Sequence, residues 1–203
     1  MRMRELGFSI VVLALAAGCA PGGSPEDAAK LSAFVVGGVP EEARSANFDF
    51  GGKVQIVGTS VSPSGTAAPG SQVTLTLYWK RTGSLEPGWG LFTHIENDEG
   101  RQLRNFDHEG GFRSALEGTK GGLSSLELGK IYQEKQTIEL PKPDELTPRV
   151  GIIVGVWHDA MRLPVVSGQT NGHEAALVAS FATGVPRRPP APPKPIAKDE
   201  KPR

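Results

Sequence analysis

The sequence predicts an all-β fold, an antiparallel β-sandwich of the immunoglobulin-like or jelly-roll-like kind. Residues 73–80 alternate strictly between apolar and polar side chains, as expected for a strand with one buried face. Between residues 48 and 183, roughly seven to nine short strand patterns recur, separated by Gly, Pro, Asn and Asp. No stretch there has the spacing of a convincing amphipathic helix, so strands must form the core.

The strand expected at 73–80 shows the period of two most clearly. Its apolar side chains share one face and its polar ones the other: Val73, Leu75, Leu77 and Trp79 against Thr74, Thr76, Tyr78 and Lys80. An apolar ladder of this kind is stable only when a second layer covers it. Two sheets packed face to face would supply that cover.

The remaining strands follow in chain order. A Pro- and Gly-containing loop at 63–70 precedes the ladder, and a tight turn at 97–100 predicts a hairpin of 91–96 with 102–106. Residues 109–130 are Gly-rich and predict an irregular surface excursion. The most apolar strand, 150–157, is expected to pair with 162–166. The full set of expected strands is 53–61, 73–80, 91–96, 102–106, 131–140, 150–157, 162–166 and 175–183.

Composition excludes some classes of function. The chain has 203 residues, with 22 basic and 22 acidic side chains, so its charge gives no bias toward nucleic acid. Its single cysteine cannot form an internal disulfide, so burial alone must stabilise the core. There is no Gly-x-Ser-x-Gly elbow of a serine hydrolase and no phosphate-binding Gly loop before a helix.

The N-terminus has the pattern of a secretory signal peptide over residues 1–18. A basic start precedes an apolar run at 6–17, which is shorter than the roughly 20 residues that span a bilayer. The run ends in Ala-Ala-Gly before Cys19, the only cysteine. This pattern resembles the lipobox of bacterial lipoproteins, which implies that acyl chains such as palmitate are attached to Cys19. Because Ala20 is not acidic, the resemblance implies an outer-membrane location, facing the periplasm or the cell surface; an ordinary signal peptide is the alternative.

The sequence divides into a signal peptide (1–18), a lipid-anchored flexible tether (19–46), the sandwich domain (47–184) and a disordered tail (185–203). The tether is expected to be flexible because residues 20–32 are small, polar and turn-rich, although 34–36 could form a short edge strand or a fixed arm. The tail is rich in Pro, Lys and Arg and favours an extended polyproline II conformation. It could be merely solvated, or it could contact an acidic surface or a partner protein.

A series of landmarks within the sandwich region resembles a β-sandwich module that is often appended to bacterial envelope glycosyltransferases. The landmarks are Phe50-Gly51-Gly52-Lys53, Leu77-Tyr78-Trp79, Phe92-Thr93-His94, Gly100, Asp107-His108, Gly129, Leu140-Pro141 and Val154-Gly155-Val156. The chain departs from the module at Leu126, where the module has Trp. The resemblance implies an envelope or glycan context and implies no catalytic role.

Two groups of side chains are candidates for chemistry. His94, Asp107 and His108 would approach one another across the 91–106 hairpin, where they could form a metal site or a His–Asp pair that fixes the loop. The large aromatic residues near loops could form a platform for sugar rings or fill the core; they are Trp89, Phe92, Phe112 and Trp157.

The sequence therefore predicts a non-catalytic lipoprotein of the bacterial cell envelope whose sandwich binds a glycan or an envelope protein. Its predicted partners are the lipid bilayer, through Cys19, and that glycan or protein, with no nucleic acid and no cofactor. The alternatives are a metal-dependent envelope enzyme that uses His94, Asp107 and His108, and a structural spacer that holds the basic tail away from the membrane.

Overall fold

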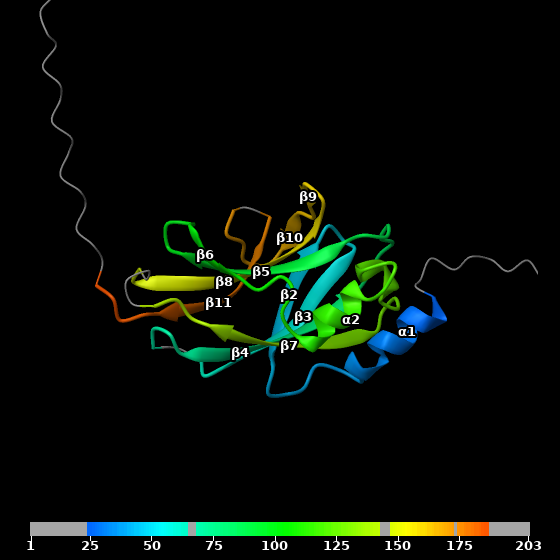
Figure 1. The fold of residues 1–203 in the computed structure, drawn as a ribbon, viewed down its shortest axis with the longest axis horizontal. Coiled ribbons are helices and arrows are strands. Elements are labelled where there is room, and N and C mark those ends of the chain that lie inside the picture. Colours follow the sequence, from blue (N-terminus) through cyan, green and yellow to red (C-terminus); the bar gives the residue numbers. More distant parts are fainter. Residues whose placement is uncertain (1–23, 65–67, 143–146, 173, 187–203) are drawn as a thin grey trace, which may run out of the picture.

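The computed structural model describes residues 24–64, 68–142, 147–172 and 174–186. Two antiparallel sheets form the two layers of a sandwich, which confirms the predicted fold class (Figure 1). The predicted signal peptide, Cys19 and nearly all of the Pro-rich tail lie outside the described residues. Within the described ranges, no helix has the length and apolarity needed to cross a bilayer.

The larger sheet has six strands and the smaller has four in its main path. The six-stranded sheet runs β1 (Val35–Val36), β7 (Ile131–Glu139), β4 (Gln72–Arg81), β3 (Val54–Ser62), β2 (Arg44–Phe50) and β10 (Val165–Ser167). The other sheet runs β11 (Ala176–Ala182), β8 (Arg149–His158), β5 (Gly90–Asn97) and β6 (Gln102–Asn105), with β9 (Met161–Arg162) paired to the end of β8.

The core lies between these sheets, and β4 is central to it as the alternation predicts. Its apolar face is fully buried through Val73, Leu75, Leu77 and Trp79. The burial of each such side chain stabilises the fold by roughly 1.5–3 kcal/mol. The outer face of β4 is covered only in part: Val39 lies beside Tyr78 over Gly58 of β3, whereas Thr74 is exposed.

Most expected strands are present with small changes at their ends. The 97–100 turn joins β5 to β6 as predicted, and 150–157 forms the core of β8. The expected pairing of 162–166 with β8 is only partly right. Arg162 pairs with Trp157, but Pro164 divides the segment, and Val165 instead pairs with Phe50 of β2 in the opposite sheet.

The N-terminal segment differs from the expected flexible tether, because α1 (Pro25–Leu31) and a 3₁₀ turn at Ser32–Phe34 precede β1. Ser24 and Asp27 form a capping box at the start of α1, which satisfies backbone N–H groups that would otherwise lack partners. Leu31 is fully buried, so α1 packs on the domain. Residues 35–36 form the short edge strand that was one of the two expectations, paired with β7.

The region 109–130 also contains helix where an irregular loop is expected. Helix α2 (Gly111–Glu117) and the 3₁₀ turn Leu123–Ser125 lie there. Phe112 and Leu116 of α2 are buried in the core, and α1 lies against α2 at one end of the sandwich (Figure 1). The last described residues lie at the opposite end of the sandwich from α1 and α2 (Figure 1).

Candidate functional site

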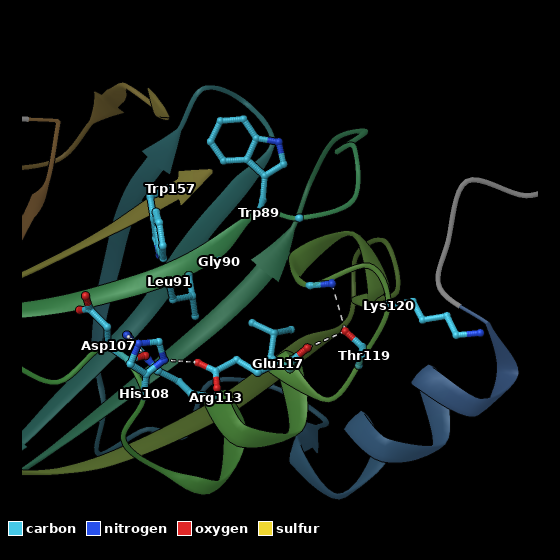
Figure 2. A pocket seen from close by; sticks show the side chains of 13 residues that line it. Trp89, Gly90, Leu91, Asp107, His108, Arg113, Glu117, Thr119, Lys120 and Trp157 are labelled. Carbon is cyan, nitrogen blue, oxygen red and sulfur yellow. Dashed lines mark hydrogen bonds and ion pairs between the residues drawn. The ribbon is translucent and has the colours of Figure 1, made fainter. Parts of the chain in front are cut away.

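A hollow of about 280 Å³ opens where the start of β5 and the end of β8 meet α2. Its walls come from the 88–91 stretch, from Trp157 of β8, from the loop that precedes α2 and from the loop that follows it (Figure 2). We call this hollow the α2 pocket. Its side-chain lining includes Trp89, Leu91, Asp107, His108, Arg113, Leu116, Glu117, Thr119, Lys120 and Trp157.

Trp157 is the exposed aromatic side chain of this pocket. It keeps 38% of its surface accessible and lies opposite Gly90 in the β5–β8 register. A Cβ atom built on Gly90 would be 3.3 Å from the indole nitrogen of Trp157, so the ring covers the glycine backbone. The absence of a side chain at position 90 therefore lets the indole lie close to the sheet while part of it remains open to solvent.

The other three predicted aromatic residues differ in their accessibility. Trp89 lines the same pocket but is only 8% exposed, with its ring centroid 5.4 Å from that of His158. Phe92 lies beneath the guanidinium of Arg162 at 4.6 Å and is almost buried. Phe112 is in the core, so it cannot contact a ligand. Trp89 and Trp157 are thus the two aromatic residues that the fold brings to one pocket.

His94 and Asp107 form the pair that the hairpin predicts. His94 Nε2 lies 3.2 and 3.3 Å from the two carboxylate oxygens of Asp107, which also accept from Thr93 N–H at 2.9 Å and Asn105 Nδ2 at 2.8 Å. Burial alone would raise the pKa of Asp107. The hydrogen bonds from His94 and Thr93 outweigh it and leave the pKa below its ordinary value. Asp107 is therefore ionised at neutral pH.

His108 turns away from this pair. Its Nδ1 lies 2.7 Å from Oε1 of Glu117, at the end of α2, and both side chains are exposed (Figure 2). The hydrogen bond and charge of Glu117 raise the pKa of His108. Across the described ranges, no three His, Cys, Asp or Glu side chains gather closely enough to hold a metal ion. Of the three predicted residues, His94 and Asp107 thus form a pair, whereas His108 pairs with Glu117 instead.

A buried cation supports the floor of the pocket. Arg113 of α2 is 1% exposed and contacts Glu134 of β7 through its Nε, 2.6 Å from Oε1. It also donates to Thr93 Oγ1 at 2.7 Å and to the Asp107 carbonyl at 3.2 Å. Because these partners lie in both sheets and in the loop, Arg113 fixes the position of Asp107 relative to the sandwich.

The pocket also contains residues that sequence reasoning missed. Glu117, Thr119 and Lys120 lie at the end of α2 and just beyond it, within the stretch treated as irregular. A weak indication is present in the sequence: Phe112, Ala115 and Leu116 have the i, i+3, i+4 spacing of one helix face. Over only seven residues, this spacing is too short to stand out from the surrounding glycines.

The arrangement offers two kinds of contact: an aromatic surface at Trp157 and a donor–acceptor pair at His108 and Glu117. The side chain of Lys120 points away from the hollow, so its ammonium is not part of this arrangement (Figure 2). An apolar ring face beside hydrogen-bonding groups suits a ligand that itself has apolar faces and hydroxyl edges. Comparison with known protein families and with curated proteins finds no match for this chain.

Proposed function

We propose that this chain is a non-catalytic, lipid-anchored protein of the bacterial cell envelope whose sandwich binds a glycan in the α2 pocket. The observation that carries the proposal is Trp157, an indole that stays 38% exposed on the wall of a hollow with polar groups opposite. A sugar ring has C–H faces that pack on an indole and hydroxyls that bond to carboxylate, imidazole and hydroxyl groups.

The shape of the site favours a small ligand unit over a broad protein surface. The α2 pocket is a concave hollow of about 280 Å³, close to the roughly 300 Å³ at which pockets for small ligands begin. His108 and Glu117 are the exposed hydrogen-bonding groups at the rim that this proposal assigns to the sugar hydroxyls. The anchor at Cys19 and the envelope location rest on the lipobox pattern of the sequence.

The test uses the full chain with Cys19→Ser, so that no lipid contributes to adsorption, on an array of envelope polysaccharides and oligosaccharides. We expect retention of at least one glycan. Trp157→Ala should weaken it by at least about tenfold, the equivalent of ~1.4 kcal/mol. Val166→Ala is the matched control, because Val166 is 62% exposed in β10 and lines no part of the α2 pocket. Equal binding by both variants, or no retention at all, would overturn the proposal.

The anchor is tested separately in bacteria that attach lipid to such cysteines. The full chain should label with a radioactive fatty acid and sediment with membranes, and Cys19→Ser should abolish both results. Soluble, unlabelled protein from the unaltered gene would contradict the anchored part of the proposal while leaving glycan binding to the array experiment.

A further inference from the structure

A second hollow, of about 310 Å³, lies on the other side of Trp157. We call it the β9 hollow because Met161 and Arg162 of β9 line it, together with the 159–160 turn and the β5 residues Phe92 and His94. Trp157 and Asp107 line both this hollow and the α2 pocket. The two hollows are therefore neighbours that share an aromatic wall and an acidic floor.

The strand register explains how the shared wall is built. On β5 and β8, Gly90 is opposite Trp157 and Phe92 is opposite Gly155. A Cβ atom on Gly155 would lie 2.2 Å from the ring of Phe92, so each aromatic ring covers a glycine of the neighbouring strand. Two rings thus follow one another on the outer face of this sheet, from the α2 pocket into the β9 hollow.

Each hollow alone is small for a ligand pocket, but together the two have the volume of an ordinary one. Ligand pockets usually measure roughly 300–1,000 Å³; the α2 pocket, at about 280 Å³, is just below that range and the β9 hollow, at about 310 Å³, is at its lower limit. Each also has both acceptors and donors at its rim. The α2 pocket has His108 and Glu117, and the β9 hollow has Asp159 and Arg162. Asp107 lines both hollows, and its carboxylate already accepts from His94, Thr93 and Asn105.

We propose that the ligand is a linear oligosaccharide of at least two sugar units that crosses Trp157, with one unit in the α2 pocket and the next in the β9 hollow. This inference rests on the proposed glycan-binding function and adds to it the length and direction of the ligand. Adjacent units of a glycan suit two adjoining hollows that share the exposed indole of Trp157, because each unit presents an apolar face and hydroxyls. A ligand of one unit fills only half of the paired hollows.

The experiment uses the full chain with Cys19→Ser on arrays that carry each sugar as one, two and four linked units at equal density. We expect two-unit chains to bind at least tenfold more tightly than single units. Ala160→Trp places a large side chain in the β9 hollow from an exposed turn position. It should reduce two-unit binding to the single-unit level and leave single-unit binding unchanged. Ser84→Trp, an exposed position that lines neither hollow, is the control for added bulk.

Asp159→Asn provides a second variant, because asparagine tolerates the positive φ of 54° at this position. It should weaken two-unit binding several-fold and spare single units. Single units that bind as tightly as longer chains, or an Ala160→Trp variant that binds two units normally, would overturn this inference while the proposed function stands. Absence of binding at every length would instead remove the proposed function itself.

Discussion

Arg113 and Glu134 form an ion pair, 2.6 Å between Nε and Oε1, in which both side chains are at most 2% exposed. The pair joins α2 to β7, and Glu134 also accepts from the indole N–H of Trp79 on β4. Arg113 in turn bonds to Thr93 of the opposite sheet. Arg113, Glu134, Trp79 and Thr93 thus form a buried polar cluster. Apolar side chains of similar volume at Arg113 and Glu134 would avoid the cost of removing two charges from water.

The first prediction concerns this pair. Arg113→Met should lower the free energy of unfolding by about 3–5 kcal/mol, because Glu134 would be left as a buried charge without its cation. Urea unfolding followed by circular dichroism measures the change. The double variant Arg113→Met/Glu134→Met should be more stable than Arg113→Met alone, since it removes the stranded charge. Equal stability of the single and double variants would contradict this account.

The second prediction concerns Gly155. A methyl group there would lie 2.2 Å from the Phe92 ring, so Gly155→Ala should destabilise the domain by about 1–3 kcal/mol. Phe92→Leu in the Gly155→Ala background should recover part of the lost stability, because the smaller leucine side chain leaves room for the added methyl group. Gly38→Ala is the control, since nothing lies within 4 Å of its added methyl group. Thermal unfolding distinguishes the three variants, and an unaffected Gly155→Ala protein would show that the contact is not as described.

The third prediction follows from the lowered pKa of Asp107, which burial opposes and the bonds from His94 and Thr93 produce. A carboxyl whose pKa is lower in the folded state contributes stability above the unfolded value near 3.8 and loses it as the pH falls through the folded pKa. Asp107→Asn should therefore cost about 1–3 kcal/mol at pH 7. It should also show a shallower loss of stability than the natural chain below about pH 4. Urea unfolding at several acidic pH values measures the free energy of unfolding of both proteins. If it falls equally steeply with pH in Asp107→Asn and in the natural chain, Asp107 does not contribute to the pH dependence.

The fourth prediction concerns His108, whose pKa is raised by the hydrogen bond and charge of Glu117. The midpoint of its imidazole titration by NMR should lie above 6.5 and return toward that value in Glu117→Gln. The contribution to folding is present below the unfolded value and fades as the pH rises through the folded pKa. It should be small, because solvent screens this exposed pair. A midpoint that ignores Glu117→Gln would show that the two side chains do not interact in solution.

The sequence predicts the strands well wherever alternation is long. In β4 the period of two extends over eight residues, and the buried face follows it from Val73 to Trp79. The turn at 97–100 likewise predicts its hairpin, and through it the contact of His94 with Asp107. These features depend on local patterns, which a single sequence contains.

The parts that sequence reasoning missed depend on contacts between distant segments. Helix α1 has mostly polar and small residues, and it is fixed on the domain by the burial of Leu31 and Asp27 and by the bonds of its side chains to the 118–120 loop. The side-chain partner of His108 could not be inferred either, because Glu117 reaches it only once α2 has formed. The exposed position of the Trp157 indole likewise depends on the register that places Gly90 opposite it.

If Cys19 carries lipid, as proposed, the docking of α1 limits how far the domain can lie from the bilayer. Lys30 donates to the Gly118 carbonyl at 2.9 Å, and Lys120 N–H lies 3.4 Å from Asp27, so α1 is fixed beside the loop that borders the α2 pocket. Only residues 20–23 separate Cys19 from the cap of α1 at Ser24. With lipid on Cys19, as proposed, five residue steps reach at most about 18 Å. So short a connection would keep the end of the domain that carries α1, α2 and the α2 pocket close to the bilayer surface.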